Sequence, residues 1–138
     1  MVPLDRRGFH EAVMARARGM CVLCGQPAVD AHHVLDRRLW VDGTQGLMPG
    51  NGAAVCGPCH LRCETTEVPV TEVRRRAGIT VFPMPPCLDP GRTYDKWGNL
   101  EMPDGTRRWG PLRDGGVERV LRRGGFLRLF PPDGLPTT

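Results

Sequence analysis

Two C-x-x-C pairs constrain the fold of this chain more than any other feature of its sequence. Cys21 and Cys24 form the first pair, and Cys56 and Cys59 form the second. Four thiolates in two such pairs can close around one Zn²⁺ at about 2.3 Å from each sulfur, which leaves no open coordination position. We therefore predict a structural zinc site that stabilises the fold and performs no chemistry. Redox-active or incidental cysteines are the alternative.

The composition favours such a metal cross-link. The chain holds 18 glycines and 14 prolines in 138 residues, so long regular elements are disfavoured and a small, loop-rich domain needs a cross-link. Residues 1–13 contain no apolar run typical of a signal peptide, and no segment approaches the ~20 apolar residues of a membrane span. We therefore expect a soluble cytoplasmic protein, in which zinc is favoured over disulfides. Cys63 and Cys87 lack a partner at this spacing and are predicted to be small buried apolar residues or free thiols.

The basic residues indicate a polyanionic partner. Lysine and arginine together number 19 against 15 acidic residues, and all but Lys96 are arginine. Because the guanidinium group binds phosphate oxygens through two parallel hydrogen bonds, an arginine excess favours nucleic-acid binding. Codon bias in a GC-rich genome is the alternative explanation.

The order of elements predicts a small α+β domain in three parts. Residues 1–20 form an N-terminal helix, residues 21–66 the core with the cysteine pairs, and residues 67–138 an extension rich in proline and glycine. The first helix is predicted to begin after Asp5 as N-cap and to end at Gly19. Its apolar residues at helical spacing are Phe9, Val13 and Ala17.

The core is predicted to be a β-β-α unit. Residues 29–35 have strand-like content, and the following loop is too rich in glycine and proline to be regular. A return strand runs through residues 53–56, and a short helix through residues 59–67 has Pro58 in its first turn.

The extension is predicted to combine short helices with a hairpin. Residues 71–78 form a helix capped by Thr71 and ended by Gly78, and the proline-rich residues 81–92 run extended. Residues 94–110 form a hairpin with a turn at Asp104 and Gly105. A last short helix and a strand occupy residues 115–130, with the helix facing inward through Val117, Val120 and Leu121.

Two adjacent histidines lie between the cysteine pairs. Neighbouring residues of a strand point to opposite faces, so His32 and His33 are predicted to do different work. One imidazole can bind a divalent metal ion, while the other, when neutral, can accept a proton from water. His60 follows a zinc ligand directly and can reach the same ion, and Glu64 lies one helical turn further, where it can bind the ion or orient His60. An incidental His-His pair, and His60 as a further zinc ligand, are the alternatives.

The order C-x-x-C, His-His, Asn, C-x-x-C-His over residues 21–64 resembles the HNH endonucleases of the His-Me finger, or ββα-metal, class in their zinc-knuckle form, of phage or bacterial type. The three letters of the motif fall on His33, Asn51 and His60. The resemblance implies that His33 is the general base, that His32 and His60 hold one divalent ion, and that the amide of Asn51 fastens the loop behind His33. Many members carry a histidine where this chain has Glu64.

The resemblance implies a metal-dependent endonuclease that nicks DNA or cuts both strands. Two imidazoles and one carboxylate suit an exchangeable Mg²⁺ or Mn²⁺ ion, with other divalent transition metals as alternatives. Arg37 and Arg38 are predicted to bind phosphates that flank the cut, with a solvated surface pair as the alternative. A zinc-ribbon module that binds nucleic acid without cutting it is the second hypothesis, and an adaptor for other proteins is the third. The three tryptophans could stack on bases or fill the core.

Overall fold

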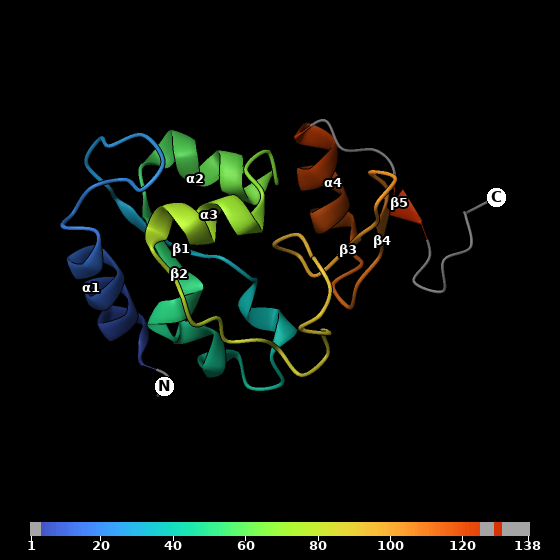
Figure 1. The fold of residues 1–138 in the computed structure, drawn as a ribbon, viewed down its shortest axis with the longest axis horizontal. Helices are drawn as coiled ribbons and strands as arrows, with labels where there is room; N and C mark the ends of the chain where they lie inside the picture. Colours follow the sequence, from blue (N-terminus) through green and yellow to red (C-terminus); the bar gives the residue numbers. More distant parts are fainter. Residues whose placement is uncertain (1–3, 125–128, 131–138) are drawn as a thin grey trace.

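The computed structural model describes residues 4–124 and 129–130 of the chain. Within these residues the chain forms four α-helices and two small sheets, which confirms the α+β class (Figure 1). Figure 1 shows α4 and the β3–β5 sheet at the end of the molecule away from α1. None of the helices in the described part of the chain has the length and apolar character needed to cross a bilayer.

Helix α1 (Arg6–Arg16) begins as predicted but ends early. The Asp5 carboxylate accepts a hydrogen bond of 2.6 Å from the Gly8 amide, which confirms Asp5 as N-cap. The helix ends at Arg16 rather than at Gly19, because the chain turns into the left-handed region already at Arg18, where φ is 54°.

Strands β1 (Asp30–His33) and β2 (Gly52–Val55) form an antiparallel pair in which His33 lies opposite Gly52. Strand β1 is shorter than its predicted range of 29–35, and β2 begins and ends one residue before its predicted range of 53–56. Beyond His33 the Val34 amide still donates to the Asn51 carbonyl at 2.8 Å, but the next amide, that of Leu35, donates to the Asn51 side chain at 2.9 Å instead of to a backbone carbonyl. The Asn51 side chain thus replaces backbone pairing at Leu35.

The two faces of this hairpin pack against different helices. Ala31, His33 and Ala54 lie on the side of α1, whereas His32 and Ala53 lie on the side of α2 (Gly57–Glu64) and α3 (Val70–Ala77). Helix α1 contacts both strands, α2 contacts β1 and α3 contacts β2. The adjacent histidines therefore do point to opposite faces, as strand geometry requires.

Glycine is required where α1 crosses β2. A Cβ atom at Gly52 would lie 2.7 Å from Cζ of Phe9 and would also collide with Val13. Phe9 and Val13 are both buried in the same small core cluster. The close contact holds α1 against the strand that pairs with the histidines.

The loop between the strands was predicted to be irregular, and it forms three short 3₁₀ helices instead. These are η1 (Arg37–Leu39), η2 (Gly43–Leu47) and η3 (Pro49–Asn51). The carboxylates of Asp36 and Asp42 cap the first two by accepting from amides two residues further on. The aspartate caps thus stabilise short helical turns in a segment whose glycine and proline residues disfavour longer helices or strands.

Helix α2 has Pro58 in its first turn, as predicted. Helix α3 begins at Val70 with Pro69 as its N-cap residue, so the predicted cap at Thr71 is wrong. Val70 is buried and joins the main core cluster, which draws the helix start one residue ahead of Thr71. Gly78 ends this helix at a φ of 72°, in agreement with the sequence.

The extension follows its predicted order. Residues 81–92 form no helix or strand, and β3 (Leu100–Glu101) pairs antiparallel with β4 (Arg107–Arg108) across a turn at Gly105. Strand β5 (Leu129–Phe130) pairs with β4 in parallel, and residues 125–128 of the predicted helix-strand segment lie outside the described residues.

Helix α4 (Gly115–Arg123) packs inward as predicted, with Val117 and Leu121 buried and Val120 half-buried. Two of the tryptophans, Trp97 and Trp109, belong to the same cluster, and Trp40 lies in the main core. All three indoles are therefore core residues rather than exposed stacking platforms.

Candidate metal centre and cleft

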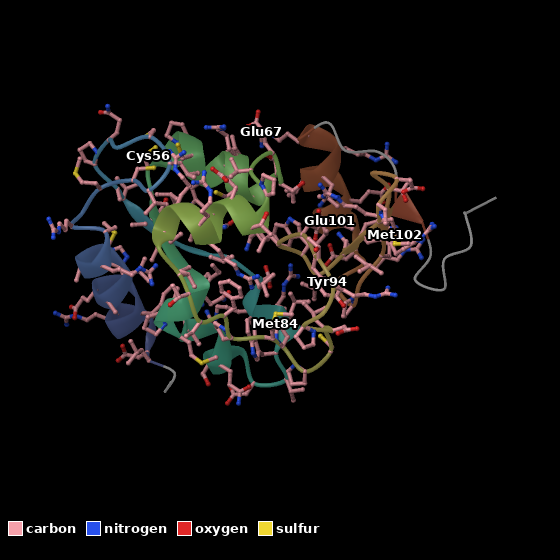
Figure 2. The ribbon with its side chains drawn as sticks, viewed as in Figure 1. Cys56, Glu67, Met84, Tyr94, Glu101 and Met102 are labelled. Carbon is pink, nitrogen blue, oxygen red and sulfur yellow. The ribbon has the colours of Figure 1, made fainter. Side chains whose placement is uncertain are left out.

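The four cysteines of the two pairs come together in one cluster. Their sulfurs all lie within 4.8 Å of one another, and the sulfurs of Cys24 and Cys56 are 3.5 Å apart. Figure 2 shows Cys56 at the beginning of α2, next to the loop between α1 and β1. The cluster could hold one zinc ion, which would tie that loop to the start of α2.

The two remaining cysteines stay outside this cluster. Cys63 is buried in the core, whereas Cys87 is exposed and its thiol contacts the Leu39 carbonyl at 3.3 Å. Cys87 is thus no buried apolar residue. His60, which could have turned toward the cysteines, directs both of its ring nitrogens to carboxylates instead.

A second group of potential ligands lies between β1 and α2. His32, His60 and Glu64 offer ligand atoms that all lie within 4.8 Å of one another. Nε2 of His60 is 3.0 Å from Oε1 of Glu64, and Nδ1 of His32 is 3.7 Å from the same oxygen. The two imidazoles meet edge to face, with ring centres 5.2 Å apart.

This group fits a divalent cation. Nδ1 of His32 is buried and has no hydrogen-bond partner among the described residues, which is costly for a polar atom. Burial lowers the pKa of His32 to about 4, so its ring is neutral at pH 7 and can offer a lone pair. Burial alone would raise the pKa of Glu64, but the imidazoles of His32 and His60 and the ammonium group of Lys96 lower it, so the carboxylate is charged.

Two residues beside this group were not identified from the sequence. The Asp30 carboxylate lies 3.0 Å from Nδ1 of His60, where it can set the orientation of the ring. The Lys96 ammonium group lies 3.6 Å from Oε2 of Glu64 and donates to the carbonyl of His33 at 3.1 Å. Two sequence features could have pointed to these residues. Asp30 precedes His32 by two positions and so shares its strand face, and Lys96 is the single lysine of the chain.

His33 lies on the other face of β1 from His32, and its side chain lines the same cleft as His60 and Glu64. Its ring stacks on Phe9, with centres 4.8 Å apart and planes 8° from parallel. This open cleft has a volume of about 830 Å³, and Asp30 and Ala31 of β1 also line it. Burial, followed by the charges of Lys96 and Arg37, lowers the pKa of His33 to about 4. The imidazole is therefore neutral at pH 7 and can accept a proton.

Asn51 is buried behind this cleft. Its side-chain oxygen accepts from the Leu35 amide at 2.9 Å, and its nitrogen donates to the carbonyls of Leu35 and Gly46 at 2.9 Å and 3.1 Å. The amide thus joins the loop before β2 to the chain that leaves β1.

We expect Asn51→Ala to lower the free energy of unfolding by about 2–4 kcal/mol, because it leaves buried groups of Leu35 and Gly46 without partners. Urea unfolding of the zinc-loaded protein measures this change. Gln45→Ala is the matched control, since Gln45 is exposed in the same loop and should shift stability by less than about 0.5 kcal/mol. Equal effects of the two substitutions would contradict a fastening role for Asn51.

The two arginines after β1 have different surroundings. Both line the cleft, but Arg38 is engaged in ion pairs with Asp36 at 3.1 Å and Asp114 at 3.5 Å. Arg37 donates to the Gly43 carbonyl at 3.2 Å and forms no ion pair within residues 4–124. Arg37 is therefore the better candidate for binding an external anion.

No protein-family model, curated protein or solved structure matches this chain. The chemistry of the site thus follows from its own residues. His32, His60 and Glu64 can hold a cation, and the last two of them line the cleft. The neutral imidazole of His33 and the guanidinium group of Arg37, which forms no ion pair among the described residues, line the same cleft. Such a set can activate water against a phosphate ester.

Proposed function

We propose that this protein is a metal-dependent HNH endonuclease of the His-Me finger, ββα-metal type, in its zinc-knuckle form, and that it hydrolyses phosphodiester bonds of DNA. The observation that carries the proposal is that His33 from one face of β1 and His60 and Glu64 from α2 line the same cleft. The succession of β1, β2 and α2, with the cysteine cluster at the start of α2, supports it.

Each residue has a distinct part in the proposed reaction. Neutral His33 takes the proton from the attacking water, and its stacking on Phe9 holds the ring in place. Asp30 orients His60, and Lys96 orients Glu64 and the backbone of His33. Arg37 binds a phosphate oxygen at the rim of the cleft.

A divalent ion bound by His32, His60 and Glu64 would neutralise charge on the phosphate and stabilise the leaving 3′ oxygen. The carboxylate of this donor set suits Mg²⁺ or Mn²⁺, and its imidazoles also allow other divalent transition metals. Since no 2′-hydroxyl is needed, DNA is a competent substrate, and the products carry 5′-phosphate and 3′-hydroxyl ends.

Supercoiled plasmid tests this proposal directly. We expect the zinc-loaded protein to produce nicked and then linear DNA when Mg²⁺ or Mn²⁺ is added, and no product without an added ion. DNA ligase should reseal the nicks, because the expected ends are those that ligase joins. A zinc-ribbon module that only binds nucleic acid would shift the plasmid on a gel without cutting it in any ion, and this result would contradict the proposal.

A further inference from the structure

The wall of the cleft opposite α2 is formed by α1. Arg6, Phe9 and His10 of this helix line the cleft, and their i, i+3, i+4 spacing places them on one helix face. Phe9 is buried against His33, whereas Arg6 and His10 are exposed on either side of it. Within the described part of the chain, the side chains of Arg6 and His10 form no hydrogen bond or ion pair, so these side chains are available to a ligand.

This wall is held firmly in relation to His33. The Arg16 guanidinium donates to the Pro49 carbonyl at 2.8 Å and also to the carbonyl of Gly52. Gly52 in turn allows the close approach of Phe9. Helix α1 is therefore fastened at its C-terminal end and along its buried face, and the position of Arg6 over the cleft is set by packing.

Among the described residues, every acidic side chain that lines the cleft is paired, whereas two of its arginines form no ion pair. Each carboxylate that lines it has a cationic or imidazole partner: Asp30 contacts His60, Asp36 contacts Arg38, and Glu64 contacts His60. Arg6 on α1 and Arg37 on η1 have no ion pair in the described ranges 4–124 and 129–130. The positive charges that are not neutralised by an ion pair there thus lie on two separate elements, α1 and η1.

We propose that α1 and η1 are the two walls of a groove for a DNA strand, in which Arg6 and Arg37 bind phosphates of the backbone and His10 lies beside Arg6. This inference rests on the proposed function, since it places the strand across the candidate cation group. Exposed arginine-phosphate contacts are weak one at a time, because solvent and salt screen them. A DNA strand carries one phosphate per nucleotide, so it can contact both arginines at once. A single phosphate group cannot make both contacts.

The test measures how salt affects binding of a fluorescent DNA duplex to the zinc-loaded protein, without added Mg²⁺ or Mn²⁺. We expect Arg6→Gln to weaken binding equally for unrelated duplex sequences and to reduce the slope of log K against log salt by about 0.9, the value for one lost phosphate contact. Arg6→Lys keeps the charge and should retain most of the slope. Arg7→Gln is the matched control, because Arg7 is the next residue of the same helix, pairs with Glu11 at 3.1 Å and does not line the cleft.

Equal slopes for Arg6→Gln and Arg7→Gln would overturn the groove, and so would a deoxynucleoside monophosphate that competes as well as the duplex. The plasmid assay keeps this result separate from the proposed function. Cleavage with an Arg6-independent slope would overturn the groove and leave the nuclease, whereas an Arg6-dependent slope without cleavage would support the groove and overturn the nuclease. Absence of duplex binding would overturn the groove as well.

Discussion

Replacement of Cys56 by serine is expected to abolish zinc binding and to unfold the part of the chain that carries the candidate site. A zinc ion held by the four sulfurs would join the loop after α1 to the start of α2, and His60 lies in the first turns of that helix. Structural zinc contributes about 10–16 kcal/mol of apparent binding free energy in zinc-finger peptides, which matches or exceeds the total stability of about 5–15 kcal/mol of an ordinary domain. Metal analysis and circular dichroism of the purified variant measure both effects.

Cys87→Ser is the matched control for this experiment. Cys87 is also a thiol, but it is exposed and lies outside the cluster. We expect this variant to bind one equivalent of zinc and to unfold at the temperature of the unaltered protein. A Cys56→Ser protein that keeps the same unfolding temperature and secondary structure would show that the cysteine cluster holds no structural metal ion.

Features that depend on neighbouring residues were predictable from the sequence. The two cysteines of each pair are close in the sequence, so they are close in space. The His60–Glu64 contact follows from their spacing of one helical turn. The cap at Asp5 and the left-handed Gly78 are also set by local backbone chemistry. In each case, only a few residues determine the geometry, so no knowledge of the tertiary structure was needed.

Features that depend on distant contacts could not be predicted in this way. The end of β1 depends on Asn51, a residue from the other side of the loop, because its side chain rather than a backbone carbonyl accepts from the Leu35 amide. The start of α3 depends on the burial of Val70 rather than on the capping strength of Thr71. Local preferences of about 1 kcal/mol are outweighed by such burial.

The same limit applies to the site. Lys96 reaches Glu64 and His33 across a long stretch of sequence, and Arg6 meets the cleft only because α1 packs on Gly52. Arg37 and Arg38 are equivalent in the sequence, yet Asp114 from the extension pairs with Arg38 alone. The charge pattern therefore predicts anion binding without saying which arginines form ion pairs, and only the packed structure separates Arg37 from Arg38.

His33→Ala is expected to lower the rate of DNA cleavage by about 100- to 10,000-fold, the usual contribution of a general base. Because burial lowers the pKa of His33 to about 4, the ring is in its proton-accepting form at pH 7, and alanine offers no substitute. His33 belongs neither to the cysteine cluster nor to the group of His32, His60 and Glu64. Zinc content and duplex binding should therefore stay unchanged, and a plasmid nicking assay measures the loss.

His60→Ala separates the two kinds of imidazole. Loss of a candidate cation ligand weakens binding of the ion, so a higher concentration of Mn²⁺ should restore part of the cleavage rate by mass action. The same increase in Mn²⁺ should leave His33→Ala inactive, because the missing step is proton transfer and not metal binding. If high Mn²⁺ restored DNA cleavage by His33→Ala, His33 would be a metal ligand rather than the general base. If His33→Ala cleaved DNA at the rate of the unaltered protein, His33 would have no part in the reaction.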